Sequence, residues 1–271
     1  MRLIRVFPRR TSLTPTDSMS FIGDPPTILP EADEVHVSVT FTWDINEGHL
    51  LKRLWENHYP VVRIGGPAMG SAVNGFTPGL YLRDGVTFTS RGCNNQCPWC
   101  LVPQREGRLT EIAAFETGNT IQDNNLLQCS RAHLDKVFAM LRTQHMIYLS
   151  GGIDARLVTD DIADDIRGLR IRQIFLACDT DNALPVLEQA VRRLQLPRFK
   201  VRCYVLLAFG TTIEQCEERL QRVWRAGALP FAQLYQPPDR FIHYSKEWRD
   251  FARTWSRPAA INTHMREMGA K

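Results

Sequence analysis

The sequence predicts an α/β protein in which a partial (βα)6 barrel, similar to a TIM barrel, follows a short N-terminal βαβ extension. Three observations lead to this prediction. Short apolar stretches rich in β-branched residues alternate with longer amphipathic stretches, and several amphipathic stretches open with a Ser, Thr or Asp that can cap a helix. The alternation runs through six units after residue 85, which is typical of a parallel sheet that is covered by helices and closes partly into a barrel.

The first 80 residues are expected to hold an arm and then the βαβ extension. Residues 1–32 are rich in Pro, Ser and Thr without a sustained period, and we expect an arm with no regular element there. The extension combines a strand at 34–41, a helix at 46–58 and a strand at 60–66 that ends in a glycine turn.

The barrel is expected to span residues 81–240, and a helical tail residues 241–271. The strands of the barrel are expected at 86–90, 119–123, 146–150, 171–178, 201–208 and 231–235. Its helices are expected at 130–142, 159–169, 183–194 and 212–227. A helical run at 246–255 carries aromatic residues on one side, and we expect it to close the open end of the barrel. Active sites of such barrels lie where the strands end, so polar residues directly after the strands are the candidates for function.

Composition argues against a membrane protein and against a disulfide-rich secreted domain. The 271 residues are 44% hydrophobic and 23% charged, and no stretch approaches the ~18 apolar residues of a membrane span. Seven cysteines is an odd count, which fits thiols in a reducing compartment, and the N-terminus shows no signal peptide, so we expect a cytoplasmic protein. Basic residues gather in two groups, which can mark a phosphate-rich partner or form an ordinary solvated surface. The groups are Arg2, Arg5, Arg9 and Arg10, and then Arg192, Arg193, Arg198, Lys200 and Arg202.

The stretch GCNNQCPWC at 92–100 carries the most specific signal. Cys93, Cys97 and Cys100 follow the first barrel strand with the spacing C-x3-C-x2-C. A [4Fe-4S] cluster usually takes four thiolates, so three leave one iron open for a ligand from substrate or cofactor. A zinc site completed by a distant residue is the alternative, although zinc favours paired C-x2-C halves and no histidine follows before His133. Three buried thiols without a metal are the second alternative.

This spacing, with Trp99 just before the last cysteine, resembles the signature of the radical S-adenosylmethionine superfamily, and the resemblance covers residues 85–240. It implies a [4Fe-4S] cluster on the three cysteines, whose open iron is chelated by the amino and carboxylate groups of S-adenosyl-L-methionine. The chemistry implied is reductive cleavage to methionine and a 5′-deoxyadenosyl radical, which abstracts a hydrogen atom from substrate. It also implies an external one-electron donor of the flavodoxin or ferredoxin type.

The resemblance extends to polar residues after successive strands. Asp123, Asn124 and Asn125 are similar to a D-D-N motif near the methionyl amino group. The stretch SGGIDAR resembles the next part of the cofactor site, where an arginine pairs with the methionyl carboxylate. Its candidate residues are Ser150, Gly151, Gly152, Asp154 and Arg156.

The following strand supplies the last part of this resemblance, because Asp179 and Thr180 are placed like the residues that bind ribose. Simpler interpretations remain open for each group. Asp123 and Asp179 could cap helices, the two glycines could form only a turn, and Arg156 could be a surface residue.

The βαβ extension, with its turn Gly65-Gly66-Pro67, resembles the end of a cobalamin-binding domain, as found before radical domains of one branch of the superfamily. Base-off cobalamin domains carry a D-x-H-x-x-G loop, and this sequence has none. We therefore expect a truncated remnant and no cobalamin. Among the other cysteines, Cys129 follows a strand end and could donate a hydrogen atom to a product radical.

The overall layout resembles small radical proteins of phage and bacterial genomes, some of which belong to pathways that elaborate thymine in DNA. This suggests an amino-acid-bearing thymine nucleotide or DNA base as substrate, undergoing rearrangement or another radical modification. A flipped base would need aromatic residues around it. The candidates are Trp43, Trp99, Tyr235, Phe241 and Tyr244. Two alternatives remain, namely a radical enzyme acting on a peptide or small metabolite and a non-catalytic, zinc-stabilised nucleic-acid-binding protein.

Overall fold

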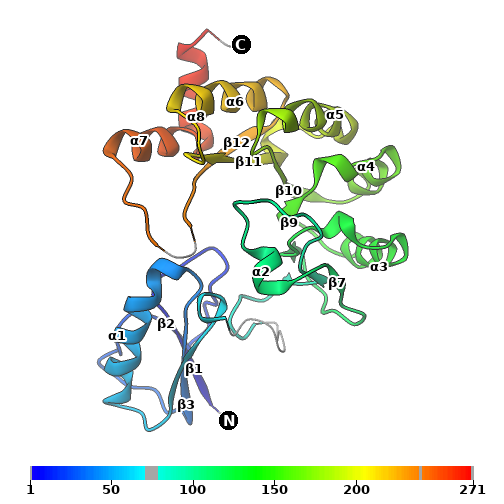
Figure 1. The fold of residues 1–271 in the computed structure, drawn as a ribbon. Coiled ribbons are helices and arrows are strands. Elements are labelled where there is room, and N and C mark those ends of the chain that lie inside the picture. Colours follow the sequence, from blue (N-terminus) through cyan, green and yellow to red (C-terminus); the bar gives the residue numbers. More distant parts are fainter. Residues whose placement is uncertain (1, 71–78, 238–239, 270–271) are drawn as a thin grey trace. The chain divides into compact units, whose positions relative to one another are not determined.

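The computed structural model describes residues 2–70, 79–237 and 240–269, and the chain divides into two compact units, Met1–Val86 and Thr87–Lys271 (Figure 1). Both units contain parallel sheets, so the protein is of the mixed α/β class. Within the described residues, no helix has the length and apolar character needed to cross a membrane.

The first unit is a four-stranded parallel sheet with the order β2-β1-β3-β4. The strands are β1 (Leu3–Phe7), β2 (Ser20–Ile22), β3 (Glu34–Ser38) and β4 (Val62–Gly65), and helix α1 (Ile45–Glu56) connects the last two. Short 3-10 turns lie at Thr42–Asp44 and Pro67–Met69. Trp55 of α1 is fully buried against the sheet, and its indole N–H donates to the carbonyl oxygen of Gly23 at 3.1 Å.

The expectation of an arm without regular elements at 1–32 is wrong, because β1 and β2 lie there. Strand β1 is an inner strand whose residues Ile4, Val6 and Phe7 are buried. Its sequence did not look like an inner strand because Arg5 interrupts the apolar run. The structure buries Arg5 by pairing it with Asp17 and with two backbone carbonyl oxygens.

The second unit has a six-stranded sheet in which spatial order follows chain order, β5-β8-β9-β10-β11-β12. The strands are β5 (Val86–Thr87), β8 (Thr120–Ile121), β9 (Ile147–Ile153), β10 (Ile171–Ala177), β11 (Val201–Leu207) and β12 (Leu229–Leu234). The intervening helices are α3 (Arg131–Arg142), α4 (Asp160–Arg167), α5 (Leu184–Leu194) and α6 (Ile213–Arg225). Neighbouring strands from β8 to β12 run parallel, as the alternation of strands and helices predicts.

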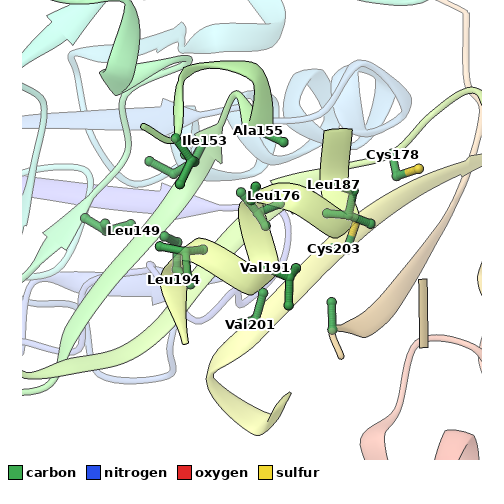
Figure 2. Close-up of a cluster of buried hydrophobic side chains, with 14 of the residues drawn as sticks. Leu149, Ile153, Ala155, Leu176, Cys178, Leu187, Val191, Leu194, Val201 and Cys203 are labelled. Atoms are coloured by element: carbon green, nitrogen blue, oxygen red, sulfur yellow. The ribbon is translucent and has the colours of Figure 1, made fainter. Parts of the chain in front are cut away.

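Alternate strand residues face the helices and form the main core. Figure 2 shows Leu187, Val191 and Leu194 of α5 among strand residues such as Leu176 and Val201. On the opposite face of β11, Tyr204 and Leu206 are only partly buried. The sheet therefore has one face packed under helices and one face that is more open.

The predicted strand at 86–90 is divided into β5 and β6 (Ser90–Arg91). Strand β6 leaves the parallel sheet and pairs with β7 (Thr110–Glu111) in an antiparallel ladder. The segment between them contains helix α2 (Val102–Glu106), which the sequence analysis did not predict.

The tail forms two helices, α7 (Lys246–Thr254) and α8 (Pro258–Glu267), of which only the first was predicted. Helix α7 packs against β12, and the amide N–H of Ala232 donates to the carbonyl oxygen of Trp255 at 3.2 Å. The tail therefore covers the edge strand of the second unit.

Candidate functional site

The three candidate metal-ligating cysteines lie on residues 92–109, here called the cysteine loop, whose base is closed by the β6–β7 ladder. The amide N–H of Cys93 donates to the carbonyl oxygen of Gly107 at 3.2 Å, which fastens the start of the loop to its end. Gly92 has a φ of +77°, and a Cβ there would lie 2.7 Å from the carbonyl carbon of Arg108. The loop can therefore close only with glycine at this position.

The three thiols of the loop lie near one another. Burial raises the pKa of Cys97, and the neighbouring Cys100, Asp179 and Cys93 raise it further. Burial also raises the pKa of Cys100, although an N–H from Val102 opposes the rise. The thiols are therefore close enough to raise one another's pKa. If all three were ionised with no cation between them, the thiolates would repel one another.

Amide groups point at the sulfur atoms. The backbone N–H of Asn95 donates to Cys93 Sγ at 3.4 Å, and the side-chain amide of Asn125 donates to the same sulfur at 3.8 Å. The N–H of Val102 lies near Cys100 and lowers its pKa. Hydrogen bonds of this kind stabilise thiolate and tune the potential of iron–sulfur clusters.

Across the described ranges of the chain, no three His, Cys, Asp or Glu side chains are arranged to hold one metal ion. A zinc ion needs such convergence, because all its ligands bind a single atom. A cubane takes one thiolate per iron, so its cysteine sulfurs stand farther apart. Thiolate is a donor that both zinc and iron–sulfur clusters take, so the donor set of the loop is compatible with either group.

Asp123, which follows β8, holds the residues that lead into the cysteine loop. Its carboxylate accepts from the backbone N–H of Thr89 at 2.7 Å, from Thr89 Oγ1 at 2.5 Å and from Ser90 Oγ at 2.7 Å. Burial raises the pKa of Asp123, and these hydrogen bonds oppose the rise. Asp123 is therefore not a helix cap. Both oxygens of its carboxylate accept hydrogen bonds from within the protein.

Glu106 is a residue of the site that the sequence analysis missed. Its carboxylate accepts from Arg91 at 2.8 Å, from the backbone N–H of Gly92 at 3.2 Å and from the side-chain amide of Asn124 at 2.5 Å. Glu106 thus links both ends of the cysteine loop to the segment after β8. No spacing rule in the sequence connects Glu106 with these partners.

The tip of the cysteine loop is fastened to the segment after β9. The side-chain amide of Asn95 donates to Asp154 at 3.0 Å, and its oxygen accepts from Arg156 at 2.9 Å. Arg156 also donates through Nε and Nη2 to the carboxylate of Asp154. Arg156 is thus a surface residue, with its side chain 61% exposed, but its guanidinium group is held by Asp154 and Asn95. Burial alone would raise the pKa of Asp154, but hydrogen bonds from Arg156 and Asn95 lower it to about 2.

Replacing Asp154 with asparagine is expected to remove a pH-dependent part of the stability of the second unit. The pKa of Asp154 is about 2 in the folded chain, against about 3.9 in an unfolded one. Its carboxylate therefore contributes stability above about pH 4, and this contribution is lost as the pH falls toward the folded pKa. The pKa difference corresponds to an upper limit of about 2.6 kcal/mol, and the contribution is smaller because solvent screens the exposed Arg156.

Urea unfolding of the wild type and of Asp154→Asn, compared from about pH 7 down to about pH 3, measures this contribution. The difference in free energy of unfolding should shrink as the pH falls. A difference that is the same at every pH would contradict the assignment of the low pKa to Asp154.

The glycines after Ser150 lie within β9, so the interpretation as a turn is wrong. A Cβ on Gly151 would lie 2.7 Å from the carbonyl carbon of Gln122 and 2.7 Å from that of Asp123. It would lie closer still to the carbonyl oxygen of Asp123. The register between β9 and β10 shifts at this place, and Gly152 has a φ of +122°. The backbone of β9 thus approaches the end of β8 closely.

Asp179, which follows β10, joins the site through Trp99. Its carboxylate accepts from the backbone N–H of Leu206 at 3.0 Å, and the indole N–H of Trp99 lies near enough to lower its pKa. Burial raises the pKa of Asp179, against the effect of these donors and of Arg219. The residue that caps the following 3-10 turn is Thr180, without a side-chain cap bond, so Asp179 is not a helix cap.

Aromatic rings gather at the same edge of the sheet. Trp99 meets Phe209 edge to face with ring centroids 5.5 Å apart, and Phe209 meets Tyr235 at 4.9 Å. Tyr244 donates to the backbone oxygen of Tyr235. The other predicted aromatic candidates are not part of this row, since Trp43 stacks on Phe41 in the first unit and Phe241 pairs with His243.

A second aromatic group, missed in the sequence, lies on the open face of the sheet. Phe175 stacks on Tyr204 at 4.9 Å, and Phe231 meets Tyr204 at 5.6 Å. The hydroxyl group of Tyr204 donates to the carbonyl oxygen of Ser150 at 3.1 Å, while Ser150 Oγ accepts from Gln122 at 2.6 Å. Alternating residues of neighbouring strands thus bring three aromatic rings close to Ser150, which precedes the glycines of β9.

The remaining cysteines are buried. Cys129 is 7% exposed, and burial raises its pKa to about 11. Cys178, Cys203 and Cys216 are fully buried in the same core. Cys129 therefore packs as a core residue, and its role as a hydrogen donor stays a prediction.

A scan against protein-family models gives no match to this chain, and a search of the curated proteins gives none either.

Proposed function

We propose that this chain is an enzyme of the radical S-adenosylmethionine type, with a [4Fe-4S] cluster on Cys93, Cys97 and Cys100. One observation carries the proposal. The loop that bears these thiols is bonded to the polar segments after two successive strands, through Asn124 and Asp154, and Trp99 of the loop lies beside Asp179 after the next strand. A rigid thiol loop over the ends of parallel strands is where a catalytic centre of an α/β protein is expected.

The second unit is proposed to be the partial (βα)6 barrel. Its support is the six-stranded sheet in chain order, with helices between the strands and one more open face. The first unit is proposed to be the remnant of a cobalamin-type domain that binds no cobalamin.

The three thiolates would hold three irons, and the other four cysteines are too buried to supply a fourth ligand. When bound, the cluster would supply the electron for reductive cleavage of S-adenosyl-L-methionine, with the electron coming from the external donor. The N–H groups of Asn95, Asn125 and Val102 stabilise the thiolates.

The remaining site residues divide into those that position the loop and those with groups left to bind the cofactor. Asp123 holds the residues that lead into the loop, Glu106 holds its ends, and Asp154 holds its tip. The peptide groups of Gly151 and Gly152 and the outer N–H groups of Arg156 remain for the methionyl part. Asn124 and Thr180 complete the set of proposed cofactor-binding residues, with Thr180 exposed near the ribose position.

The proposed substrate is a thymine-derived nucleotide or DNA base that undergoes rearrangement or another radical modification. The row of Trp99, Phe209 and Tyr235 at the edge of the sheet supports a flat substrate, because bases stack on aromatic rings. An external flavodoxin or ferredoxin type of protein is the proposed electron donor.

The second candidate function is a zinc-stabilised nucleic-acid-binding protein. Anaerobic purification followed by metal and sulfide analysis separates the two. The radical enzyme is expected to be brown and to hold about four iron and four sulfide per chain after reconstitution. Replacing Cys93, Cys97 and Cys100 together with alanine should remove both, whereas replacing the buried Cys216 with alanine should not. A colourless wild type that holds zinc would refute the radical enzyme.

A further inference from the structure

An open groove of ≈ 590 Å³ lies between helices α5 and α6 of the second unit. It is lined by Glu188, Arg192, Arg222, Arg225 and Ala226. Three guanidinium groups and one carboxylate therefore face one volume, which is large enough for several phosphate groups or a small ligand.

These arginines have no carboxylate partner within the described part of the chain. Neither Arg192 nor Arg222 makes an ion pair or a side-chain hydrogen bond there, and Arg225 bonds only to the side chain of Gln221, at 3.1 Å. Other arginines of the unit are paired, as Arg193 is with Asp160 and Arg219 with Asp181. The groove thus gathers three positive charges, with Glu188 as the one carboxylate in its lining to offset them.

The basic groups seen in the sequence do not produce this convergence. Arg193 donates to the carbonyl oxygen of Val158, Arg198 lies over the ring of Trp224 at 3.9 Å, and Arg202 is 5% exposed. The guanidinium groups of these three arginines therefore have partners or are buried within the unit. Arg192 of that sequence group instead meets two arginines that lie about 30 residues further on and belong to another helix.

Helix ends explain part of the arrangement. All three arginines lie in or near the last turns of their helices, where a positive charge gains about 0.3 to 1 kcal/mol from the helix dipole. The helix dipole explains why each arginine is favourable at its own position. It does not account for three charges facing one groove, which costs repulsion that a bound anion would remove.

We propose that this groove binds the phosphate backbone of a nucleic acid without reading its sequence. Arginine matches phosphate oxygens with two parallel N–H donors, and three of them can contact successive phosphates. The lining contains no aromatic side chain on which a base could stack, which favours a polynucleotide backbone over a free nucleotide.

The groove is separate from the cysteine loop. Helix α5 leads into the first residue of β11, so its last turn lies toward the edge where strands begin, whereas the loop lies where they end. The inference therefore does not rest on the proposed radical chemistry, and variants of the groove should leave the iron content unchanged.

Anisotropy of a labelled duplex of about 20 base pairs, titrated with the whole protein at about 50 to 200 mM NaCl, tests the proposal. The variant Arg192→Ala/Arg222→Ala/Arg225→Ala is compared with Arg172→Ala/Arg249→Ala/Arg266→Ala, which removes three exposed arginines elsewhere in the unit. The groove variant should bind the duplex at least about tenfold more weakly than the wild type. The slope of its log affinity against log salt concentration should be smaller in magnitude by about two to three.

Glu188→Gln removes the one negative charge of the groove and should tighten binding to the duplex. Melting curves that match the wild type would show that the variants are folded. Equal losses in the groove variant and its control would overturn the proposal, as would a wild type that binds tripolyphosphate in the groove but no duplex.

Discussion

Replacing Gly151 with alanine is expected to lower the free energy of unfolding of the second unit by about 3 kcal/mol or more, or to prevent its folding. A Cβ at this position would lie 2.7 Å from the carbonyl carbon of Asp123 and closer to its oxygen. Both atoms belong to the backbone directly after β8, so they cannot move aside as a flexible side chain would. The expected result is separation of β9 from the end of β8.

Gly168→Ala is the matched control for this change. Gly168 follows helix α4, and its nearest atom to an added Cβ lies at 3.4 Å, an ordinary contact. Urea unfolding followed by far-ultraviolet circular dichroism measures both variants. Equal, small effects at the two positions would contradict the close approach of β8 and β9.

Asp123→Ala is expected to cost about 3 kcal/mol, because three donors would lose their acceptor inside the protein. Two of these donors are the hydroxyl groups of Thr89 and Ser90, and the third is the backbone N–H of Thr89. Asp123→Asn should cost much less, because its oxygen can still accept from the N–H while the hydroxyl groups turn to accept from its amide.

Urea unfolding and iron content of the two variants test this role. The alanine variant should bind less iron, since the residues that lead into the cysteine loop are no longer held, and the asparagine variant should retain more. If both variants unfold and bind iron as the wild type does, Asp123 does not position the loop.

The sequence was sufficient to predict the alternating strands and helices of the second unit because local pattern decides them. Strand β11 and helix α6, for example, lie within the predicted 201–208 and 212–227. Strand β1 was missed because the burial of Arg5 depends on Asp17 and on backbone oxygens near residue 80. Long-range partners of this kind leave no periodic signal in the chain.

The sequence indicated many residues of the candidate site but not what each of them contacts. Spacing indicated the three cysteines, and position after strands indicated Asp123, Asp154 and Asp179. Spacing alone did not distinguish side chains that contact a ligand from those that hold the loop, and the structure places the three aspartates in hydrogen bonds within the protein. Glu106 was missed because its partners are brought to it only by closure of the loop.

The most direct test of the radical mechanism is the release of 5′-deoxyadenosine by the anaerobically reconstituted protein, reduced in the presence of S-adenosyl-L-methionine. The proposal predicts that the wild type and Cys216→Ala release it, and that the variant with Cys93, Cys97 and Cys100 all replaced by alanine does not. No release by a wild type that holds its iron and sulfide would contradict the radical mechanism, as would equal release by the triple variant.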